Sequence, residues 1–133
     1  MFEMDLTVRI SETVLAGHVS NTVLAVWFEE GRTPLYKEVL PELSQSGWPI
    51  ILANYSVNFH AELFLGKPVQ LKTSVKRIGN SSFETYQEAW QDGKLCASGS
   101  TVQVYFNYQT GKSEALPEAT RQGLMKHLTE NAG

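Results

Sequence analysis

The sequence predicts an α+β domain in which one long helix packs against an antiparallel sheet. Apolar side chains recur at the spacing of one helical face over residues 21–40, and the segments from 49 to 108 alternate apolar with polar residues as strands do. Turn signals separate these segments at short intervals, which favours sequential hairpins and therefore an antiparallel sheet. The 133 residues fit a single domain that spans 1–133, and an apolar fraction of 42% is sufficient for a core.

The predicted helix covers residues 21–40. Ser20 or Asn21 is suited to cap its start, because a short polar side chain accepts a backbone N–H of the first turn. Residues at steps of four, three, four and four define the buried face: Leu24, Phe28, Gly31, Leu35 and Val39. Further apolar residues widen this face, so that most of the helix is expected to be buried: Val23, Ala25 and Trp27. Pro34 should bend the helix, and Pro41 should end it before a loop over 42–48.

The expected strands cover residues 2–10, 49–59, 69–78, 83–90 and 95–108, and the helix follows the first of them. Gly79-Asn80 and Asp92-Gly93 are two-residue hairpin signals between the last strands. The sequence Thr110-Gly111-Lys112 indicates another turn. A short helix is expected over residues 117–128, with a proline at its start.

Charge and composition exclude several classes of function. A formal net charge of −3 argues against a nucleic-acid-binding protein. No apolar run approaches the roughly 20 residues that span a bilayer, and the acidic, alternating N-terminus does not resemble a targeting signal. Cys96 is the only cysteine, which fits a cytoplasmic location, and we expect it to be a small buried strand residue. The histidines lack metal-ligand spacing and no phosphate-binding glycine loop is present, so neither a metal nor another cofactor is expected.

Two motifs carry a resemblance to a known family. Residues 17–21 read Gly-His-Val-Ser-Asn, and residues 27–33 read Trp-Phe-Glu-Glu-Gly-Arg-Thr. They resemble the signature of hotdog-fold acyl-CoA thioesterases of the 4-hydroxybenzoyl-CoA thioesterase-like family, Asp-x-Asp-x-x-Gly-His-x-x-Asn followed by a helix that ends in Phe-Glu-Glu-x-Arg. The resemblance extends over nearly the whole chain. It implies a hotdog fold, with a five-stranded antiparallel sheet wrapped around a long central helix, and hydrolysis of a CoA thioester to free acid and CoA.

Thioester hydrolysis needs one group that stabilises the oxyanion and another that activates water or attacks the carbonyl. Free N–H groups at the start of a helix meet the first need. The resemblance implies that the backbone N–H of Asn21 is the oxyanion donor, although Asn21 could equally be a helix cap. His18 is expected to bond the thioester carbonyl or line the acyl pocket, or to be a structural residue.

The catalytic carboxylate is where the sequence departs from the family. The family's aspartate stands three residues before the glycine, a position held here by Val14, which has no acid–base chemistry. Glu12 occupies the outer acidic position but starts about 7 Å back along an extended segment. A related group of hotdog thioesterases carries its carboxylate on the central helix, eight residues after the oxyanion-hole residue, with a threonine four residues later. Asn21, Glu29 and Thr33 have this spacing.

Eight residues span about 12 Å of helix, so Glu29 cannot reach the start of its own helix. It could reach the helix of a two-fold-related copy, and the interpretation therefore requires a homodimer or tetramer. The alternative is that Glu29 and Glu30 are solvated, or paired with Arg32 or Lys37.

Three functions remain open at this stage. The first is a cytoplasmic acyl-CoA thioesterase, with an acyl-carrier-protein thioester as a close variant of the substrate. The second is a non-catalytic acyl-CoA-binding hotdog protein that lacks the usual aspartate at Val14. The third is a hotdog dehydratase that acts through His18 and Glu29. For the CoA nucleotide, which is part of the substrate and no cofactor, the hairpin serines Ser81 and Ser82 are the candidate contacts.

Overall fold

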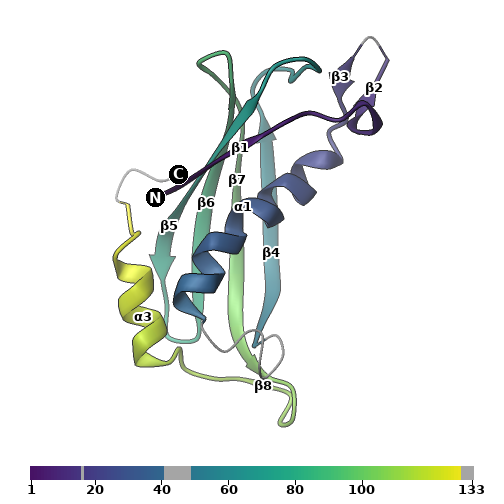
Figure 1. Ribbon diagram of the computed structural model, residues 1–133. Helices are drawn as coiled ribbons and strands as arrows, with labels where there is room; N and C mark the ends of the chain where they lie inside the picture. Colours follow the sequence, from purple (N-terminus) through teal and green to yellow (C-terminus); the bar gives the residue numbers. More distant parts are fainter. Residues whose placement is uncertain (16, 41–48, 130–133) are drawn as a thin grey trace.

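A computed structural model describes residues 1–15, 17–40 and 49–129. Its main sheet contains five long strands in the order β1 (Phe2–Leu6), β5 (Val69–Ile78), β6 (Ser82–Gln91), β7 (Lys94–Asn107) and β4 (Ile50–Phe59). All neighbouring strands are antiparallel, and the short β8 (Lys112–Ser113) pairs with the end of β7. The sheet curls around α1 (Val23–Val39), which crosses its inner face diagonally (Figure 1). The predicted α+β architecture is confirmed.

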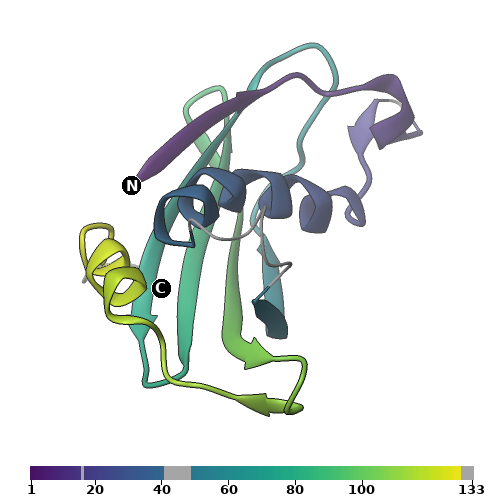
Figure 2. The same cartoon turned by 60° about the horizontal axis from the view of Figure 1, so that its bottom comes forward.

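The helix α1 buries the face that its sequence period predicts. All five residues of the predicted stripe are buried, together with Trp27, Arg32 and Tyr36. The opposite face is exposed and includes Val26 and the charged residues Glu29, Glu30, Lys37 and Glu38. The expectation that most of the helix is buried is therefore wrong, because the sheet covers α1 from one side only (Figure 2). The helix continues through Pro34, whose bend stays a prediction, and Pro41 with the loop over 42–48 lies outside the described residues.

The N-terminal strand is shorter than predicted. β1 ends at Leu6, which pairs with Val69, the first residue of β5, so beyond that point no partner strand is available. The chain instead forms the 3₁₀-helix η1 (Ile10–Glu12) and the small hairpin of β2 (Thr13–Val14) and β3 (His18–Val19).

The predicted turns are largely confirmed. Asp92 and Gly93 have φ angles of 56° and 71°, the left-handed values that a two-residue hairpin of type I′ requires. The connection between β5 and β6 has three residues, 79–81, where two were predicted. The C-terminal helix α3 (Glu118–Met125) follows Pro117 and ends three residues before the predicted boundary. No helix within the described ranges is long and apolar enough to span a bilayer.

Two apolar clusters lie along α1. The first is built around Trp27 and Phe28, with Leu71 of β5. The second is built around Leu35 and Val39 and also contains Leu124 of α3. A layer of buried polar side chains between the two clusters joins α1 to the middle of the sheet.

Gln87 of β6 is the centre of this polar layer and is 1% exposed. Its Nε2 donates to the backbone oxygen of Phe28 at 2.8 Å and to Thr73 Oγ1 at 3.0 Å, and its Oε1 accepts from Arg32 Nη1 at 3.3 Å. Thr73 in turn donates to the backbone oxygen of Gly31 at 3.1 Å. Because each of these groups is buried and satisfied, the network fixes one position of α1 on the sheet.

We expect Gln87→Leu to lower the free energy of unfolding by about 2–3 kcal/mol, because it removes one acceptor of the buried Arg32 Nη1 and the donor to Thr73 Oγ1 and to the backbone oxygen of Phe28. Chemical denaturation measures the change. Gln70→Leu is the matched control, since Gln70 is an exposed glutamine on β5, and its effect should stay within about 0.5 kcal/mol. Equal stability of the two variants would contradict the proposed role of the network.

Candidate functional site

A cavity of about 860 Å³ lies where the β2–β3 hairpin meets the start of α1 and the segment 59–63. We call it the hairpin cavity. Its wall includes Val14, His18, Asn21, Phe59 and Glu62. Figures 1 and 2 show the hairpin at one end of α1, beyond the edge of the main sheet. The Gly-His-x-x-Asn motif thus contributes directly to a cavity.

Asn21 lies in the turn that precedes α1, and its backbone N–H has no acceptor among the described residues. The neighbouring donors are satisfied by Ser20, whose Oγ accepts from Thr22 N at 3.4 Å and whose backbone oxygen accepts from Val23 N at 3.1 Å. The N-cap residue of α1 is Thr22, without a side-chain capping hydrogen bond, so the prediction that Ser20 or Asn21 caps the helix is wrong, and Ser20 instead closes the turn before α1. The free N–H of Asn21 at a helix start is suited to an oxyanion or another acceptor.

His18 is oriented by a carboxylate that the sequence analysis did not single out. Its Nδ1 lies 2.8 Å from Glu62 Oε2, and its ring packs against Phe64 with 4.9 Å between ring centroids. With the Nδ1 proton directed at the carboxylate, Nε2 of the neutral ring becomes an acceptor. Glu62 belongs to no sequence motif. It reaches His18 only because residues 63–65 run beside β3, where Leu63 O accepts from Val19 N at 2.8 Å.

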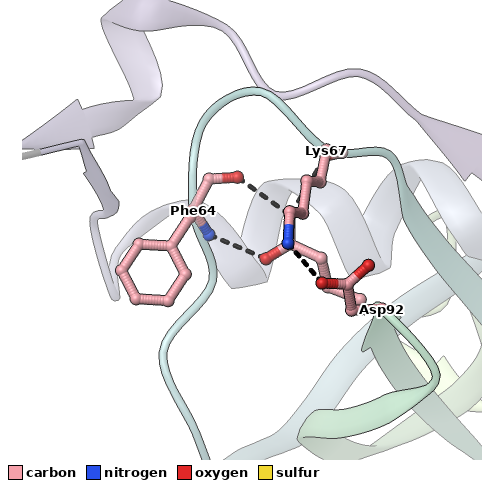
Figure 3. Close-up of polar contacts among 4 residues, drawn as sticks. Phe64, Lys67 and Asp92 are labelled. Atoms are coloured by element: carbon pink, nitrogen blue, oxygen red, sulfur yellow. Dashed lines mark hydrogen bonds and ion pairs between the residues drawn. The ribbon is translucent and has the colours of Figure 1, made fainter.

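The segment that carries Glu62 is anchored to the β6–β7 hairpin. Gln91 accepts from Phe64 N at 2.9 Å and donates to the backbone oxygens of Phe64 at 2.8 Å and Lys67 at 3.0 Å. Lys67 also forms an ion pair with Asp92 (Figure 3). These contacts hold one wall of the hairpin cavity against the sheet.

Glu12 has its carboxylate engaged outside the hairpin cavity. Its Oε1 accepts from Arg9 N and its Oε2 from Trp27 Nε1, both at 2.8 Å, while its backbone oxygen accepts from Ser20 N at 2.8 Å. Glu12 thereby fastens the hairpin to α1. Val14, at the position of the family's aspartate, is 53% exposed and lines the cavity.

Glu29 and Thr33 line a second cavity of about 380 Å³ farther along α1, together with Arg32, Tyr36 and residues 50–52 of β4. We call it the Arg32 cavity. The structure therefore brings together Glu29, Thr33 and Tyr36, as their helical spacing predicted, and separates them from Asn21 and His18 within one chain. Among the described residues neither Glu29 nor Glu30 forms an ion pair, so the suggested pairing with Arg32 or Lys37 is not present.

The remaining candidates lie outside both cavities. Ser81 and Ser82 are half-buried at the β5–β6 turn, where their backbone oxygens accept from Tyr105 N at 2.8 Å and Gly79 N at 2.7 Å. Cys96 is buried in β7, as predicted, and burial raises the pKa of its thiol. No group of three or more potential metal ligands occurs in the part of the chain that the structure describes.

Comparison with known proteins places this geometry in context. Residues 4–124 match the family model of the thioesterase-like superfamily. The chain is 37% identical to a predicted thioesterase of known structure from Bacillus stearothermophilus, with a TM-score of 0.93 over 98% of both chains. A thioesterase from Thermus thermophilus, solved with coenzyme A and Zn, is 24% identical with a TM-score of 0.83 over 93% of this chain and 91% of that one, a likeness of fold. The Bacillus subtilis protein YsmA is 22% identical over 121 residues, which are 90% of this chain and 82% of YsmA.

We expect Gln91→Ala to loosen the segment that carries Glu62, since it removes the partners of the Phe64 N–H and two backbone oxygens. Amide hydrogen exchange in residues 60–68 should accelerate by about tenfold or more, the scale of one or two lost hydrogen bonds. Mass spectrometry of peptides measures the exchange. Gln109→Ala, at an exposed glutamine, is the control. Wild-type exchange in Gln91→Ala would contradict the anchoring.

Proposed function

The chain belongs to the thioesterase-like superfamily and has its hotdog fold, and from this premise we propose that it hydrolyses an acyl-CoA thioester to free acid and CoA. The observation that carries the proposal is the free backbone N–H of Asn21, which lies at the start of a helix and in a cavity lined by His18. The Thermus relative solved with coenzyme A supports CoA as the carrier. An acyl-carrier-protein thioester remains a close variant, and Ser81 and Ser82 are the candidate contacts of the nucleotide.

In this proposal the thioester carbonyl oxygen accepts the N–H of Asn21. That oxygen becomes negative when water attacks the carbonyl carbon, and the positive end of the α1 dipole stabilises the charge where it develops. The tetrahedral intermediate then collapses. The C–S bond breaks, and the base returns the proton that it took from water to the departing sulfur, so that CoA leaves as the thiol.

Glu29 is the proposed base, and it acts on the site of a second copy of the chain. About 12 Å of helix separates it from Asn21 in its own chain. An antiparallel two-fold partner would place each Glu29 against the other copy's Asn21, with Thr33 orienting the water. The two cavities described above would then be two halves of one site.

The edge strand β4 supports this homodimer. Within the described residues β4 pairs with β7 alone, and several of its large apolar residues are exposed: Leu52 at 53%, Tyr55 at 40% and Phe59 at 54%. A long edge strand with exposed apolar side chains favours pairing with another strand. We propose that β4 forms the contact between two copies.

Two observations favour alternatives to a catalytic Glu29. The His18–Glu62 pair could supply a base within a single chain, because Nε2 of a neutral ring whose Nδ1 donates to Glu62 would accept a proton from water. Val14 in place of the usual aspartate favours a protein that binds acyl-CoA without cleaving it. Release of free thiol from an acyl-CoA distinguishes hydrolysis from such binding.

We expect Glu29→Gln to reduce turnover by about 100-fold or more while acyl-CoA still binds, since only the proton-accepting charge is removed. Thr33→Val should cost less, because the hydroxyl only orients water. Glu30→Gln, about 100° around the helix, is the matched control and should be nearly silent. Thiol release across acyl-CoA substrates measures all three.

Undiminished hydrolysis by Glu29→Gln would exclude the helix carboxylate and leave His18 with Glu62 as the base, since the carboxylate of Glu12 is engaged outside the hairpin cavity. Saturable binding of acyl-CoA by the wild type without thiol release would instead identify the non-catalytic alternative. Water loss from a hydroxyacyl thioester would identify a dehydratase.

We also expect the protein to be a dimer or a larger oligomer at micromolar concentration, because each proposed site needs two chains. Light scattering should give at least twice the mass of one chain. An active monomer would rule out the shared site.

A further inference from the structure

Arg32 is a buried cation whose described partners are all neutral. It is 4% exposed. Its Nε donates to Tyr36 Oη at 2.9 Å, and its Nη1 donates to Gln87 Oε1 and Thr101 Oγ1, both at 3.3 Å. No carboxylate in the described ranges forms an ion pair with it. Burial of a charge without an ion-pair partner is costly, so an anionic group bound at its open side would be favourable.

The free donors of Arg32 are on Nη2. A guanidinium carries five N–H groups, of which the three contacts above use the one on Nε and the two on Nη1. No described residue accepts from Nη2. Since no side-chain nitrogen in the described part of the chain is both sealed from solvent and without a partner, Nη2 still meets solvent. Because Arg32 is one of the residues that line the Arg32 cavity, we infer that Nη2 faces this cavity.

The surroundings of Nη2 suit a small anionic group on an aliphatic chain. Ile50, Ile51 and Leu52 supply an apolar wall, while Tyr36 and Gln103 supply polar groups. The positive charge of Arg32 also acts on Tyr55 of β4. Burial raises the pKa of the Tyr55 phenol, and Arg32 partly opposes that shift. A carboxylate accepts charge-assisted hydrogen bonds from a guanidinium more strongly than a neutral acceptor does.

Glu29 lies three residues before Arg32, a rise of about 4.5 Å along the helix. An anion bound at Nη2 would therefore lie only a few bond lengths from the thioester whose hydrolysis Glu29 is proposed to catalyse. The cavity of about 380 Å³ is at the small end of the usual range for ligand sites. Both points favour a short acyl group.

We propose that Arg32 binds a second carboxylate on the acyl group, so that the preferred substrates are CoA thioesters of short dicarboxylic acids. The inference rests on the proposed function, because it assigns the distal end of the same substrate. The buried positive charge, three neutral partners and an open Nη2 carry it.

The direct test compares two acyl groups of equal length in the wild-type protein, glutaryl-CoA and pentanoyl-CoA. We expect kcat/KM to be about ten- to a hundredfold higher for glutaryl-CoA, the scale of one charge-assisted hydrogen bond. Equal values, or a preference for pentanoyl-CoA, would overturn the inference while leaving thioester hydrolysis intact.

Variants assign the preference to Arg32. Arg32→Gln should reduce the glutaryl-to-pentanoyl ratio by about tenfold or more, and Arg32→Lys, which keeps the charge, should reduce it less. Arg77→Gln is the control for lost charge, because Arg77 is an exposed arginine on β5 outside the cavity. An unchanged ratio in folded, dimeric Arg32→Gln would overturn the assignment.

If the protein cleaves neither thioester, free glutarate and free pentanoate provide the test. We expect glutarate to bind measurably more tightly by calorimetry. Failure of hydrolysis with selective glutarate binding would reject the proposed function alone, whereas equal or absent binding of both acids would reject the role of Arg32.

Discussion

The hydrogen bonds of Gln87 determine how α1 lies on the sheet, and both cavities depend on that position. Gln87 holds the backbone of Phe28 and the side chain of Arg32, and through Thr73 it also contacts Gly31. Apolar packing alone would allow the helix to slide or rotate, because it is not directional. Three directed contacts between the sheet and one turn of the helix, from Phe28 to Arg32, allow one register. This register determines the position of Asn21 at the start of the helix and places Glu29 and Thr33 beside β4.

The continuous helix α1 keeps the two groups of candidate catalytic residues apart. The free N–H of Asn21 and the His18–Glu62 pair face the hairpin cavity, and Glu29 faces the Arg32 cavity. A single copy cannot bring Glu29 to Asn21 without breaking α1. A symmetric pair can, since an antiparallel arrangement of two helices places each start beside the middle of the other. A symmetric dimer would therefore explain both the exposed apolar residues of β4 and the division of the candidate catalytic residues between two cavities.

The sequence was most informative where one chain segment determines its own structure. Leu24, Phe28 and Leu35 follow the helical period, and Asp92-Gly93 requires left-handed φ angles, so both features were predictable. The polar layer was not predictable, because β6 directs Thr85 and Gln87 inward and Tyr86 and Trp90 outward, the reverse of what polarity suggests. Glu62 was missed for a related reason. It meets His18 only through tertiary contacts of the segment 60–68, which leave no spacing signal in the sequence.

Subunit complementation tests the shared site most directly. Glu29→Gln and Asn21→Pro should each be inactive as homodimers. Asn21→Pro removes a backbone N–H in the turn before α1 that donates to no described residue. A heterodimer of the two has one complete site, built from Asn21 of one chain and Glu29 of the other. Mixing equal amounts through unfolding and refolding should therefore restore about a quarter of wild-type activity, since half of the dimers are mixed and each has one intact site. Activity no higher than the mean of the two parents would contradict the shared site.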